Sequence, residues 1–128
     1  MKVLHSKGIK TVIITSCDFN PETISCYASS SSTNEIYKIQ IERIDISLVG
    51  SGDLFAALML AWYTLTNHDL KTSFEKSIGS MQDVIKRTYQ YAKQSNDPKD
   101  PKNYELQIIQ SYDEIKSPKT LISSIKIQ

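Results

Sequence analysis

The sequence has few residues of the kinds that build a scaffold from cross-links or metal ions. Its 128 residues include two cysteines and two histidines. Cys17 and Cys26 are too few for a disulfide framework or a zinc site, so we expect reduced, unreactive thiols. His5 and His68 lie far apart in the sequence and lack the spacing of metal ligands. The sequence therefore predicts one ordinary domain without a cysteine- or histidine-based metal site.

An excess of one charge is also lacking, and so is a long hydrophobic run. The formal net charge is +1, which favours neither nucleic acid nor an anionic membrane as a partner. The apolar run Leu54–Ala61 is far shorter than the roughly 20 residues of a membrane span. Lys7 and Lys10 interrupt the first apolar stretch, so it is not typical of a signal peptide. We expect a cytoplasmic protein.

Helix and strand patterns alternate along the first half of the chain, which indicates an α/β fold. Residues 1–8 are typical of the end of a helix, with Gly8 at the C′ position. The β-branched run at 11–16 predicts a buried parallel strand. Two further strands flank a polar hairpin turn around Ser29–Ser32. Residues 46–49 predict a short strand that leads into two glycines.

Two long helices and a mixed tail are expected in the second half. Leu54–Tyr63 is apolar on every side, which predicts a helix that is buried all round. Leu70–Lys93 has apolar residues at spacings of three and four, which predicts an amphipathic helix. The segment 96–103 is typical of a surface loop. Residues 104–111 predict a strand, and residues 117–128 a last short helix or strand.

The sequence Gly-Ser-Gly-Asp at Gly50–Asp53 is where chemistry is most strongly indicated. Its glycines can adopt backbone angles closed to other residues, and successive amides in such a turn can form a nest for an anion. A helix that begins there adds free N–H groups and the positive end of its dipole. Asp53 could then accept a proton from a hydroxyl that attacks phosphorus. The simpler alternative is that Ser51 or Asp53 only caps the helix.

A longer stretch resembles a known family. Residues 49–62, VGSGDLFAALMLAW, closely resemble the signature near the C-terminus of pyridoxal kinases, which belong to the ribokinase-like superfamily. The resemblance continues, in the right order, through residues 4–18, 38–53, 70–93 and 104–118. It implies that residues 1–128 form the C-terminal part of a three-layer α/β/α sandwich with a mostly parallel central sheet. The N-terminal half of that domain would be absent.

The resemblance also implies an activity and its residues. Family members transfer the γ-phosphate of ATP to the 5′-hydroxyl of pyridoxal, pyridoxine or pyridoxamine. Asp53 would be the catalytic base and contact that hydroxyl, while Gly50, Ser51 and Gly52 would form the anion hole. Threonine is more common in the family at the position of Ser51, but the hydroxyl and the amide are retained.

Further positions match the nucleotide site of the family. Thr15 and Ser16 fall at the end of a strand that contacts ATP phosphates and a monovalent cation, although ordinary strand-end hydrogen bonding is the alternative. Four apolar residues, which are equally suited to a core, fall where family members line the adenine site: Ile44, Leu48, Val49 and Ile85.

The family implies ATP, Mg²⁺ and K⁺ or Na⁺ as cofactors, vitamin B6 vitamers as substrates and a homodimer in the full-length protein. Hydroxymethylpyrimidine kinase of the same superfamily is an alternative, and a non-catalytic interaction module is another. The sequence leaves open whether the chain is a fragment, the product of an incomplete gene or a short protein in its own right. It also leaves open the vitamer preference, the oligomeric state and the activity of the isolated chain.

Overall fold

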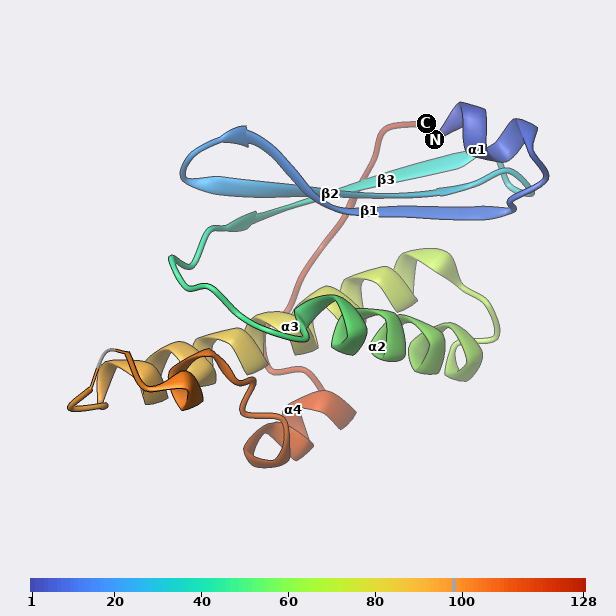
Figure 1. The fold of residues 1–128 in the computed structure, drawn as a ribbon. Helices are drawn as coiled ribbons and strands as arrows, with labels where there is room; N and C mark the ends of the chain where they lie inside the picture. The colour runs from blue at the N-terminus through green and yellow to red at the C-terminus, as the bar shows by residue number, and fades with distance from the viewer. Residues whose placement is uncertain (98) are drawn as a thin grey trace.

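A curved sheet lies over a pair of long helices in the computed structural model, and a shorter helix packs beneath them (Figure 1). The structure describes residues 1–97 and 99–128, without the side chain of Asp18. The helices and strands, in chain order, are α1 (Lys2–Ser6), β1 (Thr11–Asn20), β2 (Thr23–Ser30), β3 (Glu35–Glu42), α2 (Ser51–Leu65), α3 (Leu70–Lys93), the 3₁₀ turns η1 (Pro101–Tyr104) and η2 (Ile109–Ser111), α4 (Tyr112–Lys116) and β4 (Ile125–Lys126).

The sheet has the order β1-β2-β3-β4, and each neighbouring pair is antiparallel. The prediction of a mostly parallel sheet is therefore wrong for these strands. The physical reason is the length of their connections: Pro21 and Glu22 join β1 to β2, and residues 31–34 join β2 to β3. Turns this short connect only antiparallel neighbours, because a parallel pair needs a crossover of a dozen or more residues. A parallel bridge does link Val49 to Glu105.

Strand β1 is longer and more exposed than the predicted buried strand. It pairs with β2 on one side and forms an edge of the four-stranded sheet. Ile14 is 38% exposed, and both Thr15 and Ser16 are exposed. The register with β2 shifts between Ile14 and Cys17. Such an irregularity bends a strand and redirects its side chains, and it places Thr15 and Ser16 at the bend.

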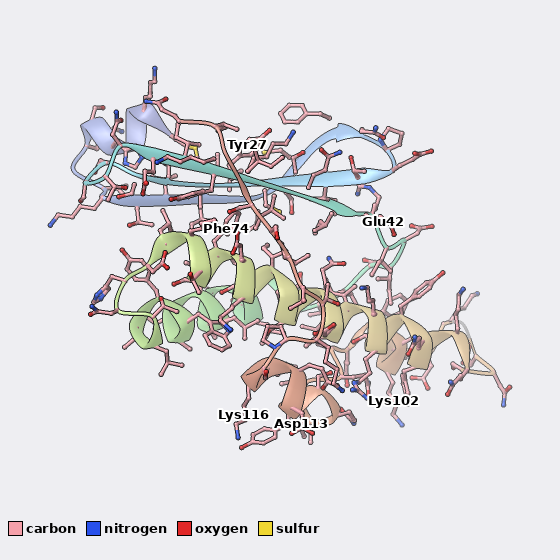
Figure 2. All side chains as sticks on the ribbon, turned by 180° about the vertical axis from the view of Figure 1, so that it is seen from behind. Tyr27, Glu42, Phe74, Lys102, Asp113 and Lys116 are labelled. Carbon is pink, nitrogen blue, oxygen red and sulfur yellow. The ribbon has the colours of Figure 1, made fainter. Side chains whose placement is uncertain are left out.

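The core lies between the inner face of the sheet and the two long helices. Cys26 and Ile39, which face each other across β2 and β3, are both about 1% exposed. Phe74 of α3 is fully buried against this face, whereas Tyr27 points to the other side of the sheet (Figure 2). The predicted helix Leu70–Lys93 is confirmed, and the Asp69 carboxylate caps it by accepting from the Thr72 N–H.

Helix α2 is half exposed, so the prediction that it is buried all round is wrong. Leu58 and Met59 are buried, but Leu60 is 71% and Leu65 74% exposed. The cause is that α2 lies against α3 on one side, and nothing from the described part of the chain covers the opposite side (Figure 1). We call this surface the outer face of α2; its members are Ala56, Ala57, Leu60, Ala61 and Leu65.

Two predicted strands are absent among the described residues. Residues 46–49 form an extended segment with one bridge at Val49. Residues 104–111 form short turns, because side-chain hydroxyls compete for the backbone: Thr88 Oγ1 accepts from the Gln107 N–H, and Ser111 Oγ donates to Gln107 O. The surface loop at 96–103 includes Pro98, which lies outside the described residues, and ends at a buried Asn103.

The C-terminal segment crosses α3 and then joins the sheet as β4, which confirms the expected last short element as a strand. Two carboxylates of α3 hold it: Asp83 accepts from the Thr120 N–H and hydroxyl, and Glu75 accepts from the Ser124 N–H at 2.7 Å. We call residues 117–124 the strap. None of the described helices is long and apolar enough to span a membrane.

Candidate functional site

A cavity of about 260 Å³ opens between the inner face of the sheet, the N-terminal turn of α2 and the middle of α3. The segment after β3 closes one side, beginning at Glu42, where the chain leaves the sheet (Figure 2). The wall combines apolar residues with polar ones, which lie at the bend of β1, at the end of β3, on α3 and at the glycine turn. The lining residues are Thr15, Ser16, Ile24, Cys26, Ile41, Glu42, Arg43, Ile44, Ile46, Leu48, Ser51, Gly52, Phe55, Ile78, Met81, Gln82 and Ile85.

Most of the site residues expected from the sequence meet in this one cavity, although they come from four separate parts of the chain. Those that line it are Thr15, Ser16, Ile44, Leu48, Ser51, Gly52 and Ile85. Val49, Gly50 and Asp53 are not among the lining residues, and Val49 is 73% exposed.

The glycine turn has the conformation that an anion site needs. Gly50 is the N-cap of α2 with φ +83°, in the left-handed region. The first backbone hydrogen bond of α2 is made by the Leu54 N–H, which donates to Gly50 O at 3.0 Å. The N–H groups of Ser51, Gly52 and Asp53 therefore have no acceptor within the helix. The turn itself is held in place by the Val49 N–H, which donates to Tyr104 O at 3.1 Å.

The capping alternative is not what the structure shows. No side chain makes a capping hydrogen bond at this end of α2, so neither Ser51 nor Asp53 serves as a cap. The left-handed backbone is confined to Gly50; Gly52 lies inside the helix, with open space where a Cβ would be. Gly52 therefore leaves room beside the cavity and is not needed for an unusual backbone angle.

Asp53 is exposed on the first turn of α2. Its carboxylate makes no hydrogen bond or ion pair with any residue that the structure describes. Because this carboxylate has no hydrogen bond or ion pair with a described protein group, it is available to accept a hydrogen bond from a ligand hydroxyl. Asp53 also follows directly after the two residues, Ser51 and Gly52, that line the cavity.

The thiol of Cys26 forms part of the wall behind the bend of β1. Its Sγ–H donates to the backbone oxygen of Thr15 at 2.8 Å. Burial, together with the nearby Cys17, raises the pKa of the Cys26 thiol to about 12. The thiol therefore stays protonated at neutral pH and is a poor nucleophile, as expected from the sequence. Within the described residues, both cysteines are free and no cluster of three His, Cys, Asp or Glu side chains could hold a metal ion.

Three polar residues of this wall were not predicted from the sequence: Glu42, Arg43 and Gln82. Gln82 lines the cavity from α3, on the same helix face as Ile78 and Ile85. The signal was present, because a glutamine four residues after Ile78 interrupts the apolar spacing of the helix. Phe55, one helical turn after Ser51, is a further lining residue that the motif alone did not indicate.

Comparisons with known proteins agree with this geometry. No family model matches the chain. Pyridoxal kinase of Bos taurus is 32% identical over 138 residues, which cover 97% of this chain and 44% of that protein. Pyridoxal kinase from Leishmania donovani, solved with ADP and pyridoxamine, has a TM-score of 0.86 at 22% identity, covering 99% of this chain and 42% of its own. Plasmodium falciparum PdxK, solved with AMP-PNP and PL, has a TM-score of 0.75 at 29% identity, covering 99% and 41%.

The arrangement of sheet, helices and cavity thus defines the class: the chain has part of an α/β fold of the ribokinase-like type. Within that class it is homologous to the pyridoxal kinases, as the signature at residues 49–62 indicated. The chain spans less than half the length of the curated relatives that it matches.

Proposed function

We propose that this chain supplies the nucleotide cavity, the anion hole and the catalytic base of an ATP-dependent pyridoxal kinase. One observation carries the proposal: the cavity collects Thr15 and Ser16 from β1, Ser51 and Gly52 from the glycine turn, and three of the four residues of the expected adenine site, Ile44, Leu48 and Ile85. These positions are remote in sequence, and they meet at one cavity.

The proposed reaction follows from the positions of these groups. The 5′-hydroxyl of a vitamin B6 vitamer lies beside Asp53, whose carboxylate accepts the hydroxyl proton as the oxygen attacks the γ-phosphorus of ATP. The bond from that phosphorus to the bridging oxygen breaks, and ADP leaves. The free amides of Ser51 and Gly52 bind the negative charge of the transferred group. Positioning and charge stabilisation of this kind supply most of the acceleration in phosphoryl transfer.

The described residues include no carboxylate cluster that could hold Mg²⁺ by itself. We propose that Mg²⁺ comes with the nucleotide, and that K⁺ or Na⁺ binds near Thr15 and Ser16. A homodimer of the complete kinase and a cytoplasmic location are further proposals by homology.

The test is production of pyridoxal 5′-phosphate from pyridoxal and Mg-ATP. We expect no measurable turnover from residues 1–128 alone, because the relatives are more than twice as long. Co-expression with the N-terminal half of a close relative should restore some turnover, and Asp53→Asn in the same complex should lower that turnover by roughly 10²–10⁴. Absence of ATP binding by both the chain and the complex would contradict the proposal.

A further inference from the structure

Helix α2 presents an apolar surface that nothing in the described part of the chain covers (Figure 1). No lysine, arginine, aspartate or glutamate occurs at residues 54–68, whereas the exposed positions of α3 include Lys71 and Lys86. The outer face of α2 consists of three alanines and of Leu60 and Leu65, which are 71% and 74% exposed. A helix that faces water normally carries charged or polar side chains on that side. An uncharged face of this kind marks a site of interaction with another protein surface.

The open edge of β1 continues this surface. Among the described residues β1 pairs only with β2, so one row of its backbone N–H and C=O groups has no strand beside it. Both ends of β1 lie close to α2: Ser16 lines the candidate nucleotide cavity together with Ser51, and Thr11 lines a second cavity together with Tyr63. The strand therefore runs along the helix (Figure 1). A single partner can pair with β1 while it packs on α2.

The proposed catalytic base lies on the same face of α2. Asp53, Ala57 and Leu60 follow one another at spacings of four and three residues, which align them along one side of a helix. By the same geometry Phe55, which lines the cavity, lies on the opposite side. A substrate hydroxyl that reaches Asp53 therefore approaches from the uncovered side. Enclosing a small molecule there requires a further wall, which the described residues do not supply.

We propose that the outer face of α2 and the open edge of β1 form the docking surface for the N-terminal half of a pyridoxal kinase domain. The inference rests on the proposed function, which requires the substrate to meet Asp53. The relatives indicate this partner, because this chain matches 44% of the pyridoxal kinase of Bos taurus and 42% of the Leishmania donovani chain. The rest of such a domain packs against the matched part, and here that part offers an uncovered apolar face beside an unpaired strand edge. A second copy of this chain is the competing occupant, but it only repeats residues that are already present.

The experiment captures the partner on the full chain. Residues 1–128 with an affinity tag are co-expressed with the untagged N-terminal half of Bos taurus pyridoxal kinase, and the retained amount is measured. We expect Leu60→Glu to lower the retained amount by roughly tenfold or more, the effect of losing an interface hot spot. Ile109→Glu is the matched control, because Ile109 is 87% exposed and lies on η2, outside the docking surface. It should retain as much as wild type.

A second measurement removes the dependence on a separately folded half. The same N-terminal half is fused ahead of Met1, and labelling of Leu60→Cys and Ile109→Cys by a maleimide is followed by peptide mass spectrometry. Position 60 should be protected, whereas position 109 should react freely.

Equal retention by Leu60→Glu and wild type, or equal labelling of the two positions, would overturn the inference. Self-association of the chain that excludes the half would also overturn it. So would insoluble protein in both forms, since covering the surface should make the complex soluble. Stable capture by wild type that Leu60→Glu abolishes, without formation of pyridoxal 5′-phosphate, would contradict the proposed function alone.

Discussion

Two residues of the Gly-Ser-Gly-Asp turn have distinct tasks. Gly50 provides the left-handed backbone that begins α2, whereas Asp53 contributes a carboxylate that no described protein group occupies. Asp53 makes no capping hydrogen bond to the start of the helix. Substitutions at these two positions should therefore affect different measurements, one the stability of the fold and the other the rate of the reaction.

Asp53→Asn should separate catalysis from stability. In the complete enzyme, turnover should fall by roughly 10²–10⁴, the usual effect of losing a general base. ATP affinity should change little, and thermal unfolding should shift only by the weak helix-dipole contribution of about 0.3–1 kcal/mol. Steady-state kinetics and calorimetry on the same preparation measure both quantities. Wild-type turnover in the variant would mean that Asp53 is not the base.

The glycines of the turn should respond differently to added side chains. Gly50→Ala should lower the free energy of unfolding by about 1–2 kcal/mol, because its φ of +83° is unfavourable for a side chain.

Gly52→Val should weaken ATP binding with a smaller loss of stability, since Gly52 is helical and lines the cavity. Ser51→Thr should be mild in both measurements, because the amide is unchanged. Urea unfolding with ATP titration tests the series; a severe Ser51→Thr beside a normal Gly52→Val would contradict it.

At the scale of elements, the strap fixes the sheet and α3 to each other. It passes so close to α3 that a Cβ on Gly79 would lie 2.6 Å from Thr120 O. Below the strap, the carboxylate of Glu114 on α4 accepts from Arg87 at 2.8 Å and from Lys119 at 2.6 Å. The strap, α3 and α4 are therefore connected by close packing and by a shared carboxylate.

Gly79→Ala should destabilise the protein although alanine favours helices. The gain in helix propensity is about 1 kcal/mol, but the methyl group must displace the backbone at Thr120, and overpacking of this kind costs about 1–3 kcal/mol. We expect a net loss in chemical denaturation. Gly52→Ala is the control, because its Cβ meets nothing within 4 Å. Greater stability of Gly79→Ala than of wild type would show that the strap does not lie where we describe it.

Stability should fall in acid in a manner that depends on Glu114. The hydrogen bond from Lys119 holds the pKa of the Glu114 carboxyl below its usual range, with Arg87 acting in the same direction. A group with a lowered folded-state pKa stabilises the protein above its ordinary value of about 4.3 and loses that contribution as the pH falls through the folded pKa. Denaturation of wild type and Glu114→Gln between neutral pH and about pH 3 tests this. The variant should show the shallower acid dependence; parallel curves would contradict the assignment.

Elements with a strong local signal could be predicted from the sequence. Helix α3 has regular apolar spacing and a capping Asp69, and both act within the helix itself. The hairpin of β2 and β3 follows from two strand-forming runs around a polar turn. The direction of the strands and the burial of the helix faces could not be predicted as well, because both depend on neighbours that are remote in sequence. The exposure of Leu60 and the antiparallel direction of β1 result from which elements lie beside them.

The sequence indicated candidate site residues where a motif specified them, but it did not indicate residues that only packing brings to the cavity. The glycine turn was indicated by its own residues, and Thr15 and Ser16 by the family resemblance. Thr15, Ser16, Ser51 and Gly52 line one cavity. Gln82 was missed because, although it interrupts the apolar spacing of α3, a single glutamine belongs to no motif. Val49 was predicted as an adenine-lining residue, but it does not line the cavity and is exposed.

At the scale of the whole molecule, two surfaces are exposed that folded proteins usually cover. One is the outer face of α2, with Leu60 and Leu65 more than two-thirds exposed. The other is the free edge of β1, whose backbone groups have β2 on one side only. Apolar patches and open strand edges both promote association with other chains.

The purified chain of 128 residues should therefore self-associate or be poorly soluble. Leu60→Glu and Leu65→Lys together should shift sedimentation toward the monomer, because they place charges on the outer face of α2. Leu58→Glu is the contrasting variant: it lies on the buried side of the same helix and should unfold the protein. A wild-type chain that sediments as a monomer at high concentration would contradict the expectation.

The late pairing of β4 with β3 has a consequence for biosynthesis. Tyr37 and Lys38 of β3 pair with Lys126 and Ile125, so they leave the ribosome long before their partners are made. At roughly 5–20 residues per second, that interval lasts several seconds. During it, β3 presents unpaired amides and carbonyls on a nascent chain. The greatest risk of misassembly at this edge thus falls during translation, before the finished sheet exists.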